Sequence, residues 1–164
     1  MYKYISWISV ILWAVLIFYL SHQPAEESRE LSGGVTEVVA QTVEKVGPNV
    51  EFDIRDFHRE VRKNAHFFIY LILGFLVVNA LRASNVLGYR SVILALLICV
   101  LYAIVDEVHQ LFIPGRSGEV RDVLIDTAGA SVGIGVYLLI NIIVKKGKSK
   151  KVKLNSKVKD TRVR

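Results

Sequence analysis

The stretch Val92–Gln110, VILALLICVLYAIVDEVHQ, decides which kind of fold this chain can adopt. Its first part, Val92–Val105, contains no charged side chain, and the stretch then ends with two acids, a histidine and a glutamine. A helix that crosses the hydrocarbon core of a bilayer needs about 20 mainly apolar residues. The stretch is therefore typical of a membrane-spanning helix that carries a polar group near one end.

Three more apolar stretches of similar length lie on either side of this one. The four predicted spans cover residues of about 4–20, 63–82, 91–113 and 122–144. The first span resembles a secretory signal, but cleavage after Ala25 would require a small residue in place of Gln23, so we expect a retained helix. The sequence thus predicts an all-α integral membrane protein with four transmembrane helices in one domain, residues 1–144.

The positive charge of the chain lies mostly in its last residues. The net charge is +6, but residues 145–164 carry ten of the 21 Lys and Arg residues and one of the 15 acids. The rest of the chain is slightly acidic, which argues against a basic nucleic-acid-binding fold and against nucleic acid as a partner. We expect residues 145–164 to form a basic cytoplasmic tail that contacts anionic membrane lipid.

The charges of the loops predict how the spans are oriented. The short loop with Arg82 and Arg90 carries no acid and is expected inside, whereas the loops 21–62 and 114–121 carry mixed charge and are expected outside. We therefore expect a multi-pass protein of the plasma membrane with both termini in the cytoplasm. The sequence contains no Gly-rich phosphate-binding loop, and we expect no cofactor.

The outer loop, residues 21–62, contains a second kind of helical pattern. Apolar residues recur at helical spacing between residues 31 and 46, with charged residues on the other side, and Gly47-Pro48 follows. This pattern predicts an additional extracytoplasmic amphipathic helix. After it, we expect one long helix from about Ile54 to Arg82 that begins outside the bilayer.

Polar residues inside the spans gather at the outer ends. An ionisable side chain within a span costs about 2.5–3.5 kcal/mol on insertion scales, so such residues need a reason to be there. A helical period of 3.6 residues places them on one face of each helix. These faces contain Lys63, His66, Tyr70 and Gly74 in the second span; Cys99, Tyr102, Asp106 and His109/Gln110, with Glu107 beside them, in the third; and Asp122, Asp126, Gly129 and Gly133 in the fourth.

Glycines on the same faces indicate where the polar residues point. Gly129-x-x-x-Gly133 is a small-residue pattern of packed membrane helices, so we expect Asp126 to point into the bundle. Asp106 lies about seven residues before the predicted end of its span, which is about 10 Å of helix. The spacing therefore predicts one polar pocket below the outer surface, with Arg116 and Arg121 brought over it by the Pro114–Gly118 turn.

These residues together resemble the VanZ family of small membrane proteins, which is named for a teicoplanin-resistance determinant. The matching pattern consists of Lys63-x-x-His66 with Tyr70 and Gly74, Asp106-Glu107-x-His109-Gln110, Pro114-Gly115-Arg116-x-Gly118, Asp122, Asp126 and Gly129, with Ser21-His22-Gln23-Pro24 after the first span. The resemblance covers about residues 5–142. It implies a four-helix membrane protein linked to glycopeptide resistance or envelope biology. Some members carry a phosphotransbutyrylase label, which an outward-facing cluster does not support.

Two interpretations of the pocket involve no reaction. Buried charges can pair simply to hold helices in register. Alternatively, the ligand types of His66, Asp106, His109 and Asp122 or Asp126 can bind a metal ion. We expect no metal, because Lys63 and Arg116 oppose a cation and no His-Glu-x-x-His motif is present.

Two further interpretations give the pocket an activity. A transporter is disfavoured because the inner halves of the spans are almost entirely apolar. An enzyme or binding protein fits better, because partly desolvated carboxylates and a histidine can transfer protons. We expect the pocket to bind or modify an anionic lipid-linked envelope molecule or a lipoglycopeptide. The predicted roles are catalysis for Asp106, Glu107 and His66, anion binding for Lys63, Arg116 and Arg121, and orientation for Tyr70, Gln110, Asp122 and Asp126. The competing possibility is a non-catalytic membrane protein that binds or assembles envelope components.

Overall fold

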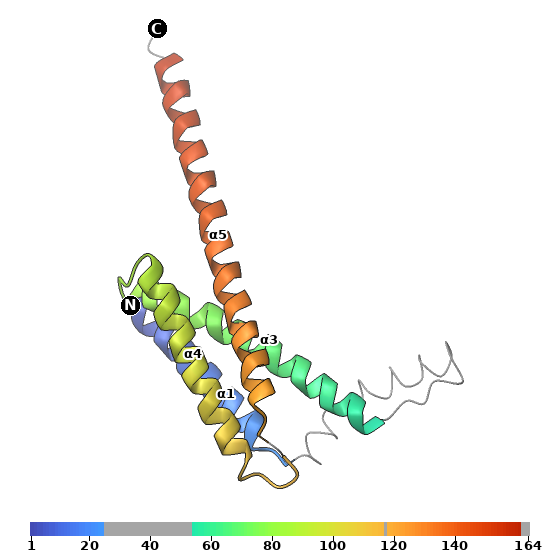
Figure 1. Ribbon diagram of the computed structural model, residues 1–164. Helices are drawn as coiled ribbons and strands as arrows, with labels where there is room; N and C mark the ends of the chain where they lie inside the picture. The colour runs from blue at the N-terminus through green and yellow to red at the C-terminus, as the bar shows by residue number, and fades with distance from the viewer. Residues whose placement is uncertain (25–53, 117, 162–164) are drawn as a thin grey trace, which may run out of the picture.

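The computed structural model describes the backbone of residues 1–24, 54–116 and 118–161 and the side chains of residues 1–24, 63–116 and 118–147. Its helices are α1 (Tyr2–His22), α3 (Ile54–Ala83), α4 (Tyr89–Gln110) and α5 (Val120–Thr161) (Figure 1). Four helical segments are long and apolar enough to cross a membrane: Tyr2–His22, Lys63–Ala83, Tyr89–Gln110 and Val120–Gly147. The predicted all-α, four-span fold is confirmed. The amphipathic helix predicted between residues 31 and 46 lies outside the described residues.

The ends of the helices follow from local sequence. Pro24 disfavours helical geometry in the residue before it, and Gln23 has the extended angles φ −70° and ψ 133°, so α1 ends at His22. Between α3 and α4, Asn85 has φ 64° and Gly88 has φ 68° with ψ −146°. The second conformation is accessible to glycine alone, and it allows a short turn to bring α4 back along α3.

Two helices differ in length from a simple span. The start of α3 projects beyond the bundle, as predicted for one long helix from about residue 54 to 82, and α5 continues at the other end through most of the basic tail (Figure 1). The third span was predicted to reach Ile113, but α4 ends at Gln110. The N–H groups of Phe112 and Ile113 instead bond to the carbonyls of His109 and Gln110 in a tight turn. Asp106 therefore lies about 6 Å of helix from the end of α4, less than the sequence suggested.

The central helix of the bundle is α3, which contacts α1, α4 and α5, and its contact with α5 is the most extensive. Glycines allow these two backbones to approach closely. A Cβ added at Gly129 would overlap the backbone oxygen of Phe67, and one added at Gly133 would overlap that of Leu71. In the opposite direction, a Cβ added at Gly74 of α3 would overlap the backbone oxygen of Ala130. The helix-packing role predicted for Gly129 and Gly133 is confirmed, and Asp126 and His66 lie on the faces that these glycines bring together.

The outer surface of the bundle is apolar, as a bilayer requires. Large apolar side chains remain exposed along every helix, including Ile11, Val15, Leu101, Val105, Leu139 and Ile143. Soluble monomers rarely expose a continuous apolar surface of this kind. In a membrane protein, lipid covers such a surface. The buried residues are mostly small or branched, and the polar ones among them are concentrated at one end.

Candidate functional site

A small polar pocket opens at the end of the bundle opposite the α3–α4 turn. It is formed by the start of the apolar part of α3, the end of α4 and the start of α5. Its lining residues are Lys63, His66, Glu107, Gln110, Asp122, Ile125 and Asp126. The enclosed space has room for about one water molecule. The structure thus brings together most of the residues that the sequence assigned to one pocket.

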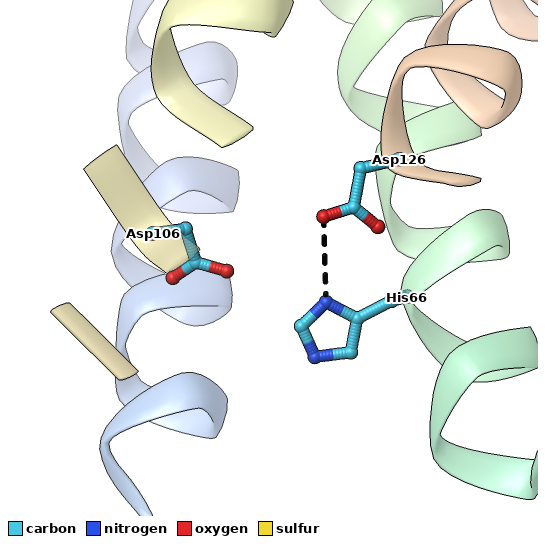
Figure 2. Close-up of side chains that lie close together, drawn as sticks. All are labelled: His66, Asp106 and Asp126. Carbon is cyan, nitrogen blue, oxygen red and sulfur yellow. Dashed lines mark ion pairs between the residues drawn. The ribbon is translucent and has the colours of Figure 1, made fainter. Parts of the chain in front are cut away.

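His66, Asp106 and Asp126 converge from three different helices beside this pocket (Figure 2). His66 and Asp126 line the pocket, and Asp106 lies next to them without lining it. The Nδ1 atom of His66 lies 3.7 Å from Oδ2 of Asp126. Asp126 is fully buried, and neither of its carboxylate oxygens has a hydrogen-bond partner within the described part of the chain. An ionised carboxylate in this setting is costly unless a positive charge compensates it.

Asp106 is held in place by α1 as well as by its own helix. Its Oδ2 atom accepts hydrogen bonds from Ser21 Oγ at 2.9 Å and from Gln110 Nε2 at 3.4 Å. Ser21 is fully buried, although it belongs to the last turn of a helix that is otherwise apolar. The Oδ1 atom of Asp106 has no hydrogen-bond partner among the described residues. The carboxylate is therefore oriented through one oxygen, while the other is buried without a partner among the described residues.

Lys63 lies between two acids at the mouth of the pocket. Its Nζ atom is 3.3 Å from Glu119 Oε2 and 3.2 Å from Asp122 Oδ1. Glu107 is fixed separately, because its Oε2 atom accepts a hydrogen bond of 2.9 Å from the backbone N–H of Glu119. The predicted anion-binding lysine thus already has two carboxylate partners.

Arg116 reaches across to the end of α1. Its Nε atom donates to the carbonyl oxygen of Gln23 at 2.8 Å, and Nη2 donates to that of Leu20 at 3.0 Å. These bonds occupy carbonyls that a helix leaves unpaired at its C-terminus. Arg121 is exposed and does not line the pocket. Of the three predicted anion-binding residues, only Lys63 is a lining residue.

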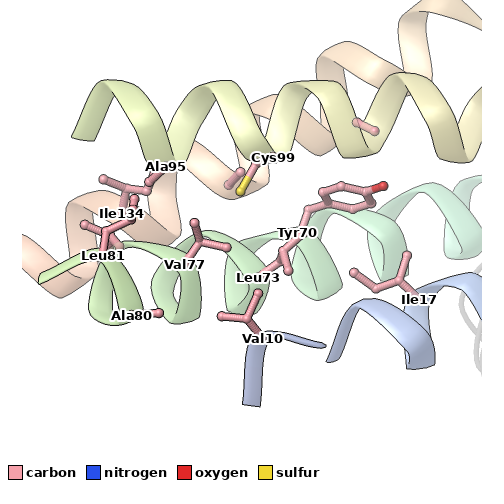
Figure 3. Packing of buried hydrophobic residues seen from close by; sticks show 13 residues of the cluster. Val10, Ile17, Tyr70, Leu73, Val77, Ala80, Leu81, Ala95, Cys99 and Ile134 are labelled. Carbon is pink, nitrogen blue, oxygen red and sulfur yellow. The ribbon is translucent and has the colours of Figure 1, made fainter. Parts of the chain in front are cut away.

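Tyr70 connects the polar pocket with the apolar core (Figure 3). It is fully buried, and its ring lies 6.4 Å from that of His66, one turn earlier in α3. The hydroxyl group of Tyr70 has no hydrogen-bond partner among the described residues. A hydroxyl is normally paired when buried, so this group is a donor available to a bound molecule or water.

His109 lies outside the pocket. Its Nε2 atom is 3.2 Å from Nδ1 of His22, and its ring stacks on Phe18 at 4.5 Å between ring centroids. The sequence placed His109 among the possible metal ligands, on the same face as Asp106. In the structure the side chain of His109 packs against α1 instead. Cys99, by contrast, is a buried packing residue, as the sequence predicted.

The charge of the site is negative. The Asp, Glu, Lys and Arg side chains described at this end are five acids (Asp106, Glu107, Glu119, Asp122 and Asp126) and three bases (Lys63, Arg116 and the exposed Arg121). With neutral His66, the formal charge of this group is therefore about −2 in the ionisation states of free side chains. Such a group attracts a cation, and it accepts an anion only if some of this charge is displaced or neutralised.

Three residues at the site were not predicted. Ile125, an apolar lining residue, carried no signal of its own. Ser21 was noted only as part of the turn after the first span, and Glu119 was not singled out. A serine at the end of an apolar span was the one sequence signal for Ser21, while Glu119 follows directly on the Pro114–Gly118 turn. Both contacts join residues that are far apart in the sequence, Ser21 with Asp106 and Glu119 with Lys63.

Comparison with known proteins agrees with these features. Neither the curated proteins nor the solved structures that were compared gave a match. The model of one protein family, VanZ/LLP1, matches residues 6–141, which include all four spans and every residue of the pocket. The chain therefore belongs to the VanZ/LLP1 family.

Proposed function

We propose that this protein binds an anionic envelope molecule at the polar pocket and acts on it chemically. The molecule is either a lipid-linked envelope intermediate or the acidic end of a teicoplanin-type lipoglycopeptide, as the family name suggests. The observation that supports this proposal is the convergence of His66, Asp106 and Asp126 from three helices, with carboxylate oxygens left unpaired. Holding helices in register requires paired charges, not unpaired ones.

The reactive groups we propose are His66, Asp106 and Glu107. His66 lines the pocket and is proposed to accept or donate a proton, with Oδ2 of Asp126 3.7 Å from its Nδ1 atom. Glu107 lines the pocket and keeps one oxygen on the backbone N–H of Glu119. Tyr70, Gln110 and Asp122 surround these groups. This arrangement suits acid–base chemistry on a group that enters from the mouth of the pocket.

The anionic group of the ligand would be received at the mouth by Lys63. The side chain of Glu119 is 27% exposed and that of Asp122 is 14% exposed, so Glu119 is the more accessible of the two lysine partners. A carboxylate or a singly charged phosphodiester that displaces Glu119 gains a charge-assisted bond to Lys63 and leaves the charge beside Lys63 unchanged. Arg116 and Arg121 are proposed to contribute long-range attraction.

The proposed orientation places the pocket at the outer surface of the plasma membrane. Arg82, Arg90 and the basic end of α5 all lie toward the opposite end of the bundle from the pocket (Figure 1). Because positive residues favour the cytoplasmic side, both termini would be cytoplasmic. An amphiphilic ligand in the outer leaflet could then reach the pocket without crossing the membrane.

The test compares strains that carry Asp106→Asn, Glu107→Gln or His66→Ala at equal protein level. We expect each change to reduce teicoplanin resistance or the envelope phenotype of the wild type, while Arg90→Gln at the opposite end leaves it unchanged. Mass spectrometry of envelope lipids and glycans then separates catalysis from binding. An unchanged inventory in a deletion strain would indicate a binding or assembly protein, and unchanged phenotypes in all three variants would refute the assignment of the site.

A further inference from the structure

The three side chains that converge beside the pocket have the composition and spacing of a metal site. One possible ligand atom from each of His66, Asp106 and Asp126 lies within 4.8 Å of the other two. The three side chains face one space from α3, α4 and α5 (Figure 2). The two carboxylates are shielded from solvent, since Asp106 is 2% and Asp126 0% exposed, and His66 is 13% exposed. This burial distinguishes the group from acidic clusters on a solvated surface.

The distance between His66 and Asp126 is unusual for a direct pair. At 3.7 Å, Nδ1 and Oδ2 are too far apart for a hydrogen bond, which spans about 2.7–3.2 Å. An imidazole nitrogen and a carboxylate oxygen bound to one tetrahedral ion lie about 3.4 Å apart, given bonds of about 2.0–2.2 Å. The two groups thus lie at nearly the separation that a shared ion imposes. Side-chain movements of about 1 Å would bring all three ligands onto one ion.

The hydrogen bonding of the two carboxylates also indicates a metal site. Asp106 uses Oδ2 for its bonds with Ser21 and Gln110, while its Oδ1 atom is buried without a partner. Metal-binding carboxylates are commonly oriented in this way, through hydrogen bonds that leave one oxygen for the ion. Both oxygens of Asp126 are also unpartnered. The buried, unpaired oxygens therefore belong to the same two residues that supply ligand atoms.

The two basic side chains nearby have other partners as well. Lys63 is engaged by Glu119 and Asp122. Arg116 donates to carbonyls of α1, and its charge also acts on Asp106. The acids at this end outnumber the bases, so the net attraction for a cation remains. The adjoining pocket, which His66 and Asp126 line, has room for about one water-sized particle.

We propose that His66, Asp106 and Asp126 bind one divalent metal ion between α3, α4 and α5, at the edge of the pocket. One imidazole and two carboxylates favour a transition metal such as Zn²⁺ over Ca²⁺, which takes six to eight oxygen ligands. The open position of the ion faces the pocket. Ion binding does not depend on the proposed function. If that function also holds, His66 and Asp106 serve the reaction by holding the ion, Glu107 keeps the acid–base role, and the charge of the ion helps the acidic pocket to accept an anionic group.

The experiment uses the full chain, purified in detergent, stripped with chelator and dialysed against Zn²⁺ or Mn²⁺. We expect one bound ion per wild-type chain by elemental analysis, and a Mn²⁺ spectrum typical of protein-bound ion by electron paramagnetic resonance. Asp126→Asn and His66→Gln should lose the bound ion. Ser21→Ala should weaken the affinity at least about tenfold, because it removes the partner that orients Asp106.

Asp122→Asn is the matched control, because it makes the same chemical change one turn earlier on α5. Asp122 pairs with Lys63, so this variant should retain the ion. Thermal unfolding checks the fold independently. Without metal, Asp126→Asn should be at least as stable as the wild type, since it removes an unpaired buried charge, and added Zn²⁺ should raise the Tm of the wild type alone.

The proposal is overturned if the wild type binds no ion at millimolar concentration. It is also overturned if Asp126→Asn keeps the ion, or if Asp122→Asn loses it to the same extent, since the charge of the whole pocket would then explain the binding. None of these measurements uses resistance or envelope composition. Failure of the metal site therefore leaves the proposed function standing, and an absent phenotype leaves the metal site standing.

Discussion

Replacement of Gly133 by alanine tests how closely α3 and α5 must approach. A Cβ at this position would overlap the backbone oxygen of Leu71 on α3, which cannot rotate away as a side chain can. Gly135 lies on the same helix, two residues later, and a Cβ there meets nothing within 4 Å. The pair Gly133→Ala and Gly135→Ala therefore adds the same methyl group to the same helix, once inside a helix contact and once outside it.

The expected difference follows from the cost of overpacking. Alanine is favoured over glycine in a helix by about 1 kcal/mol, and this gain applies equally to both variants. Overpacking of a tight contact costs about 1–3 kcal/mol, and the upper part of this range applies where backbone must move. We expect Gly133→Ala to unfold with a free energy about 1–3 kcal/mol lower than Gly135→Ala.

Unfolding by sodium dodecyl sulfate in mixed micelles, followed by circular dichroism, measures this difference. Tryptophan fluorescence offers a second probe, because Trp13 Nε1 donates to the carbonyl of Ile69 at 2.9 Å and so reports the contact of α1 with α3. If the two alanine variants unfold at the same detergent fraction, the close contact between α3 and α5 is not what stabilises the bundle. A weakened ion site in Gly133→Ala alone would show that the same contact also positions His66 against Asp126.

Two further predictions concern the turn regions. Arg116→Lys should lower the free energy of unfolding by about 1–3 kcal/mol, because lysine cannot donate from two rigidly spaced nitrogens to the carbonyls at the end of α1. An unchanged unfolding curve would contradict that role of Arg116. The second prediction concerns topology and uses a Cys99→Ala background. Phe112→Cys should react with an impermeant maleimide on intact cells, whereas Leu87→Cys should react only after permeabilisation. The reverse labelling would show that the proposed topology is inverted.

The comparison of sequence and structure is clearest for the acids of the pocket. Helical periodicity was sufficient to place Asp126 on the same face as Gly129 and Gly133, and thus inside the bundle. It placed Asp106 and His109 on one face as well, but the structure separates them: Asp106 lies beside the pocket, while His109 stacks against Phe18. Residues three positions apart on a helix differ in direction enough to meet different neighbours, and only packing decides which.

The charged residues show a second limit. The sequence contains Lys63 and Arg116 near several acids, which favoured a free anion-binding pair. In the structure Lys63 lies between Glu119 and Asp122, and Arg116 bonds to backbone carbonyls of α1. Backbone carbonyls carry no sequence signal as acceptors, because every residue has one. No pattern in the chain could therefore have indicated the partner of Arg116.

The sequence by itself determined the number of spans, the long helix from residue 54 and the gathering of polar residues such as Lys63, His66 and Asp126 at one end of the spans. These features depend on local backbone preferences and on the thickness of a bilayer, which act on each segment separately. The tertiary structure decided which of these residues meet. Contacts such as Ser21 with Asp106 depend on the rotation and spacing of whole helices, and these are set where glycines allow two backbones to touch.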